Sequence, residues 1–103
     1  MKVVITEAAK LDLVEIGEFI RSHNPKRAAS FIQELLQHCE ALGDRPRAYP
    51  LIPRYEQHGV RRSVYRDYLV FYRINGELLE VLHVLNGARD YERLLFDGPT
   101  GEN

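Results

Sequence analysis

The dipeptide Asn75-Gly76 separates two strongly apolar runs, residues 65–74 and 77–85, and this feature constrains the fold most. Asn-Gly tolerates the positive φ angles of a type I′ turn, which makes it the strongest short-range signal for a β-hairpin. Neither run alternates cleanly between apolar and polar residues, which is typical of strands buried on both faces. A chain of 103 residues has few other elements with which to cover two faces. The sequence therefore predicts a central hairpin that needs unusually extensive cover.

A two-residue turn at Asn75-Gly76 would place Arg73 opposite Leu78 and divide the side chains between two faces. The more apolar face, which we expect to pack against helices, holds Tyr68, Val70, Tyr72, Ile74, Leu79, Val81, His83 and Leu85. The other face holds Leu69, Phe71, Arg73, Leu78, Glu80, Leu82 and Val84. We expect this second face to stay open and to bind a protein partner, with Arg73 and Glu80 fixing the register. The alternative is that a proline-rich loop and the C-terminal segment cover it.

Two amphipathic helices are predicted before the hairpin, after a short strand at residues 3–5. Thr6 can cap the first helix, which runs to about Ser22. Asn24-Pro25 starts the second, with asparagine as the cap and proline at the first helical position. Gly43 is expected to end it in the left-handed region. Each helix has one apolar face, so the pair can cover one side of a sheet.

The remaining segments complete a single α+β domain over residues 1–96. Residues 44–59 contain three prolines and are predicted to form a loop, and residues 60–65 start the next strand. Residues 97–103 are polar and expected to form a frayed tail. The predicted order is β-α-α-β-β-β, with a mainly antiparallel sheet and the helical hairpin packed on one face.

Charge and composition exclude several classes of function. The net charge is -1, so the whole chain is not a general nucleic-acid binder, although residues 45–73 hold seven arginines against two acidic residues. That block fits an interface or an anion site, or simply a solvated face. The four histidines lack metal-ligand spacing, and Cys39 falls on an apolar helix face. No cofactor, metal, signal peptide or membrane span is predicted, and a cytoplasmic protein is expected.

Several stretches resemble the ParE branch of the RelE/ParE superfamily of type II toxin–antitoxin systems. They are Asn24-Pro25 with the alanines that follow, residues 50–56, residues 68–74 and residues 81–91. The resemblance covers Val3 to Phe96 and implies the same β-α-α-β-β-β fold. It also implies a cognate ParD-like antitoxin that wraps the toxin and carries any contact with operator DNA.

The resemblance implies one of two activities. RelE-like members cut mRNA on the ribosome with basic residues and a late tyrosine, whereas ParE-like members poison DNA gyrase, block replication and are not known to be enzymes. The central-strand arginine and the late tyrosine of RelE-like members correspond to Leu69 and Leu95 here, although Arg89 matches. Leucines can neither stabilise a charged transition state nor transfer a proton. A gyrase poison without catalytic residues is therefore expected. The alternatives are a RelE-like mRNA endonuclease and an inactive toxin retained as a repressor partner.

Two sets of site residues follow from position, polarity and this resemblance. The predicted target-binding residues are Arg61, Arg62, Arg89 and Tyr91. The predicted antitoxin-binding residues are Leu69, Phe71, Arg73 and Leu82, together with the exposed rims of both helices.

Overall fold

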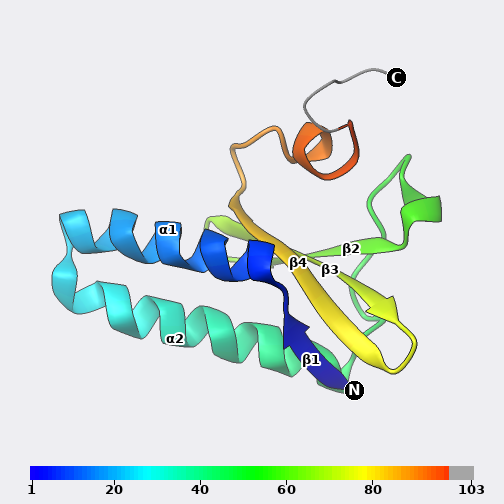
Figure 1. Ribbon diagram of the computed structural model, residues 1–103, viewed down its shortest axis with the longest axis horizontal. Coiled ribbons are helices and arrows are strands. Elements are labelled where there is room, and N and C mark those ends of the chain that lie inside the picture. Colours follow the sequence, from blue (N-terminus) through cyan, green and yellow to red (C-terminus); the bar gives the residue numbers. More distant parts are fainter. Residues whose placement is uncertain (98–103) are drawn as a thin grey trace.

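The computed structural model describes residues 1–97 and has the predicted order of elements (Figure 1). The helices and strands are β1 (Lys2–Ile5), α1 (Glu7–His23), α2 (Pro25–Ala41), β2 (Val60–Tyr65), β3 (Tyr68–Asn75) and β4 (Leu78–Asn86). Short helical turns lie at Leu42–Asp44, Glu56–His58 and Arg93–Asp97. The sheet order is β1-β4-β3-β2, with β1 parallel to β4 and the other pairs antiparallel. The α+β prediction is confirmed. Apart from Asp97, the predicted frayed tail lies outside the described residues.

Both helices begin where the capping residues predict. The Thr6 hydroxyl accepts a hydrogen bond from the Ala9 amide at 3.3 Å, and the Asn24 side chain accepts one from the Arg27 amide at 3.3 Å. Pro25 occupies the first turn of α2, where its missing N–H leaves no bond unmade. These local bonds fix where the helices begin, and the two helices then pack side by side as a hairpin (Figure 1).

Gly43 does not end α2 in the left-handed region, so that prediction is wrong. The helix ends at Ala41 and continues into the tighter turn Leu42–Asp44. A Cβ atom at Gly43 would clash with the Met1 carbonyl oxygen, and the Met1 ammonium donates a hydrogen bond to the Gly43 carbonyl at 2.9 Å. Glycine stands here because the start of β1 passes close to its backbone.

We expect Gly43→Ala to lower the free energy of unfolding by about 1–3 kcal/mol, because an added methyl group would displace the backbone at Met1. Thermal unfolding measures the loss. Gly59→Ala is the control, since its Cβ would meet nothing within 4 Å but its φ of +74° still opposes a side chain. No measurable loss in Gly43→Ala would mean that the close approach at Met1 is unimportant.

The hairpin turn lies one residue later than predicted. Asn75 pairs with Leu78, so the loop residues are Gly76 and Glu77, and only Gly76 has a positive φ, of 62°. A two-residue hairpin loop with glycine first needs no positive φ at its second position. Arg73 therefore lies opposite Glu80 rather than Leu78.

A β-bulge then reverses the alternation of side chains along β4. Phe71 pairs with His83 and Tyr72 with Val81, which leaves Leu82 as an extra residue. Beyond the bulge, Val84 faces the helices and Leu85 faces the opposite side, the reverse of the prediction for both residues.

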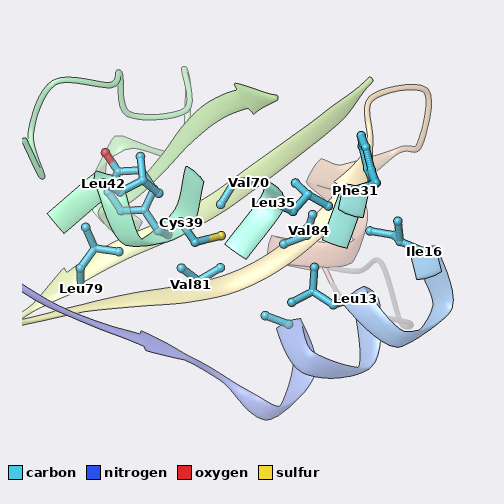
Figure 2. Packing of buried hydrophobic residues seen from close by; sticks show 12 residues of the cluster. Leu13, Ile16, Phe31, Leu35, Cys39, Leu42, Val70, Leu79, Val81 and Val84 are labelled. Atoms are coloured by element: carbon cyan, nitrogen blue, oxygen red, sulfur yellow. The ribbon is translucent and has the colours of Figure 1, made fainter. Parts of the chain in front are cut away.

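The main core lies between the helical hairpin and one face of the sheet (Figure 2). Leu35 and Cys39 of α2 point toward Val70, Val81 and Val84 of the sheet. Burial raises the pKa of the Cys39 thiol to about 11, so this cysteine is an unreactive core residue, as predicted. The buried strand residues Val70, Tyr72, Leu79 and Val81 confirm the helix-facing assignment.

A charged hydrogen-bond network joins α2 to β2. Arg27 donates to both carboxylate oxygens of Glu34, at 2.8 and 3.0 Å, and the Tyr65 hydroxyl donates to the same carboxylate at 2.7 Å. These donors lower the pKa of Glu34 from 4.5 to about 2.

We expect Glu34→Gln to lower the melting temperature at neutral pH. Because the folded pKa is depressed, the ionised carboxylate stabilises the fold above pH 4.5, and this contribution is lost as the pH falls toward 2. Melting curves of the parent and variant should therefore converge between pH 4.5 and pH 2. A difference that stays constant over this range would show that the charge of Glu34 does not matter.

Candidate functional site

The sheet face opposite the helices is closed by the chain itself, so the prediction of an open face is wrong. Phe71 is 0 % exposed and packs with Ile52, Val60 and Leu85. Half-buried side chains from the proline-rich loop, the strands and the C-terminal segment surround this cluster: Tyr55, Leu69, Leu82, Tyr91, Leu95 and Phe96. The alternative prediction is correct: the proline-rich loop and the C-terminal segment cover this sheet face.

Aromatic contacts and an ion pair hold the C-terminal segment over this face. The rings of Tyr55 and Phe96 stack with centroids 4.1 Å apart and planes at 4°. The Tyr91 ring lies 4.9 Å from that of Phe71, and Arg54 forms a 2.9 Å ion pair with Glu92. Aromatic contacts of this kind add to the apolar area that they bury, so residues 91–96 are an integral layer of the fold.

Arg62 and Tyr91, two of the predicted target-binding residues, meet on this face. The Arg62 guanidinium donates a hydrogen bond to the Tyr91 hydroxyl at 2.6 Å and lies 5.8 Å from the centre of its ring. Both residues are half-buried, so each keeps some exposed surface. The two side chains together form one small polar surface at the edge of the closed cluster.

Arg61 and Arg89 lie elsewhere. Arg61 neighbours Arg62 on β2 and so points to the opposite sheet face, where it donates to the Tyr49 carbonyl at 2.7 Å. Arg89 lines a separate cavity of about 350 Å³ with Asp12, Glu15 and Phe19 of α1. The four predicted target-binding residues therefore do not form one continuous site.

The predicted antitoxin-binding residues also differ in access. Phe71 offers no surface to a partner, and Leu69 and Leu82 are half-buried against the same cluster. Arg73 is exposed, but its guanidinium pairs with Glu80 at 3.0 Å, and this bond and one from Asn75 lower the pKa of the Glu80 carboxyl. Arg73 and Glu80 thus bind each other across the hairpin.

An apolar groove runs between α1 and α2 on the outer side of the helical hairpin, which is the surface predicted as the exposed rims of the helices. Its volume is about 710 Å³. Ile32 and Leu36 of α2 line one wall and Val14 and Gly17 of α1 line the other. Val14 is 57 % exposed and Leu36 is 38 % exposed. The apolar residue Val14, which lies outside the core spacing of α1, is the sequence signal for this groove.

Several polar side chains in the described part of the chain join neighbouring elements of the fold. His83 and the Val84 amide both bond to the Asp12 carboxylate, at 2.8 and 3.0 Å, and His38 contacts the buried Ser63 at 2.9 Å. Within residues 1–97 there is no metal-ligating cluster and no buried side-chain polar atom without a hydrogen bond. None of the helices described is long and apolar enough to span a bilayer.

Comparison with known proteins identifies the family. Residues 3–91 match the family described as "ParE toxin of type II toxin-antitoxin system, parDE". The chain belongs to the ParE toxin family. Its fold is similar to a chain of a chromosomal ParDE toxin–antitoxin system from P. aeruginosa, with a TM-score of 0.72 and 18% identity over 84% of this chain and 95% of that chain. No curated protein matches this ParE-family chain.

A second solved structure also has a similar fold. It is a chain of the toxin–antitoxin complex RelBE2 from Mycobacterium tuberculosis, with a TM-score of 0.59 and 22% identity over 82% of this chain and 95% of that chain. The likeness to these two structures shows the fold of the chain.

Proposed function

We propose that this ParE-family toxin acts by binding and poisoning DNA gyrase, as a non-enzymatic cytoplasmic protein, and does not cut mRNA. The observation that carries the proposal is the closed sheet face. Phe71 is fully buried there, and Leu69 and Leu95 occupy the positions where the RelE resemblance would place an arginine and a tyrosine. An aliphatic cluster supplies neither a general acid or base nor a donor for developing charge.

Arg62 and Tyr91 are the first target contacts in this proposal. Their mutual hydrogen bond holds both polar groups at the edge of the closed face, where a protein surface could reach them. Arginine and tyrosine are also the residue types that most often dominate the binding energy of protein interfaces.

A supercoiling assay with purified gyrase tests this proposal. We expect the toxin to inhibit supercoiling and to accumulate cleaved DNA, and Arg62→Ala to weaken both effects. Arg47→Ala is the matched control, because its side chain is exposed in the loop and makes no hydrogen bond in the described chain. No effect of folded parent toxin at micromolar concentration would contradict the proposal for the gyrase tested.

An mRNA endonuclease is the second candidate, because Arg62 and Arg73 both lie on the sheet face opposite the helices. Primer extension on translated mRNA after induction would then show new 5′ ends. The same mRNAs in cells expressing Arg62→Ala provide the control for background breakage.

We further propose that the cognate ParD-like antitoxin places the apolar side of an amphipathic helix in the groove between α1 and α2. The groove supports this because it is apolar, exposed and shaped by two parallel ridges of side chains. Because Phe71 is covered, it is unsuitable as an anchor for the antitoxin. The exposed rims of the helices are therefore the main antitoxin-binding surface in this proposal. Contact with operator DNA would come only through the antitoxin.

A further inference from the structure

The outward stripe of α1 carries apolar side chains that no other part of the described chain covers. Leu11 is 65 % exposed and Val14 is 57 % exposed. The stripe recurs at spacings of three and four residues and consists of Glu7, Lys10, Leu11, Val14, Gly17, Glu18 and Arg21. Its inner edge is also the α1 wall of the groove. This spacing is typical of the seam between two helices that lie side by side.

The stripe is self-complementary about Val14. In an antiparallel pair with a two-fold axis through this residue, positions equally far from 14 face each other. Glu7 then faces Arg21 of the second copy, and Lys10 faces Glu18 of the second copy. Each of these pairs joins opposite charges, and symmetry makes each pair occur twice. Val14 meets its own counterpart at the centre, so an apolar contact is flanked by matched charges.

Gly17 provides an independent argument. Glycine inside a helix weakens it relative to alanine. A Cβ atom at Gly17 would meet Ile32 Cγ1 at 3.5 Å, an ordinary contact, so the packing of α1 on α2 does not require glycine. Under the two-fold arrangement Gly17 faces Leu11 of the second copy and leaves space for that side chain. A close approach by another helix accounts for a glycine that the single chain does not need.

We propose that two copies of this chain associate through α1 in this antiparallel arrangement. Within one copy, Lys10 pairs with Glu7 at 3.3 Å and Arg21 with Glu18 at 4.0 Å, and all four side chains are exposed. Exposed pairs contribute little, so their exchange for pairs between copies costs little. A contact made by one helical stripe of each copy is small for a protein interface, so we expect the dimer to form reversibly. It needs neither gyrase nor antitoxin, and it goes beyond the proposed toxin activity.

Sedimentation equilibrium of the purified full chain tests the association. The mean mass should rise from 12.0 kDa toward twice that value as concentration increases. K10E places like charges together at both symmetric sites and should weaken the dimer at least about ten-fold. The double variant K10E/E18K restores opposite charges across the axis and should recover dimerisation. Circular dichroism of each variant confirms that α1 is still folded.

Gly17→Ala distinguishes this specific two-fold arrangement from non-specific association through an exposed apolar helix. We expect the variant to melt at a higher temperature when dilute, because alanine favours the helix. Its dimer should nevertheless be weaker, because the methyl group fills the space for Leu11 of the second copy. A parent chain that stays monomeric at every concentration, with the groove occupied only by added antitoxin, would overturn the proposal. So would a folded K10E/E18K variant that does not recover dimerisation.

Discussion

Phe71→Ala is expected to lower the free energy of unfolding by about 3–5 kcal/mol, because it empties the centre of the closed sheet face. The ring is 0 % exposed and contacts a cluster that includes Ile52, Leu85 and Tyr91. The sheet on one side and the C-terminal segment on the other limit how far the cavity can collapse. Urea unfolding followed by circular dichroism gives the loss from the midpoint and slope.

Leu94→Ala is the control for the Phe71 variant. Leu94 lies in the same C-terminal segment but is 47 % exposed, so its truncation should change stability by less than about 1 kcal/mol. A small loss in Phe71→Ala, similar to that of Leu94→Ala, would mean that the segment does not cover the sheet in solution. The open face originally expected from the sequence would then return as a binding surface.

Leu36→Asp is expected to weaken binding of the cognate antitoxin by at least about 2 kcal/mol, roughly 30-fold in Kd. Leu36 lines the groove between the helices, and an apolar helix seated there would bury the introduced carboxylate without a partner. Isothermal titration calorimetry with the antitoxin measures the change. Since Leu36 is 38 % exposed in the free chain, the variant should fold.

Val64→Asp is the matched control for the groove variant. Val64 is an apolar residue with 58 % exposure on β2, outside the groove between the helices. Its substitution introduces the same charge and should leave antitoxin affinity nearly unchanged. If Val64→Asp weakened binding and Leu36→Asp did not, the antitoxin would bind along the sheet rather than between the helices.

The helical half of the fold could be predicted because its signals are local. Thr6 and Asn24 cap helices through hydrogen bonds that span three residues, and Pro25 acts on its own backbone. The apolar spacing of α2 then identifies its core face directly. Gly43 was misassigned because its role depends on Met1, which is 42 residues away.

The sheet was predicted less completely because its details depend on pairing between distant strands. The extra residue at Leu82 is defined only by the register of β4 against β3, and no local pattern marks it. The assignments of Val84 and Leu85 were reversed for this reason. The closing of the second face likewise depends on Tyr55 stacking on Phe96, a contact across 41 positions that periodicity does not reveal.

The candidate site shows the same division. The positions of Leu69 and Leu95 could be compared with family patterns, because that comparison needs only the sequence. Arg62 bonds to Tyr91 because the C-terminal segment passes over its side of the sheet. Arg61 points away because neighbouring side chains on a strand alternate between faces. The groove between the helices requires the packing of α1 on α2, so its sequence signal was limited to exposed apolar residues.

The cover over Phe71 also has a consequence for how the chain folds. Residues 91–96 follow the whole sheet in the sequence, so a folding intermediate with paired strands and an undocked segment would expose Phe71 and Leu85 to water. Transiently exposed apolar surface of this kind makes a folding intermediate prone to aggregation. Docking of residues 91–96 is therefore the step that removes this apolar surface from water.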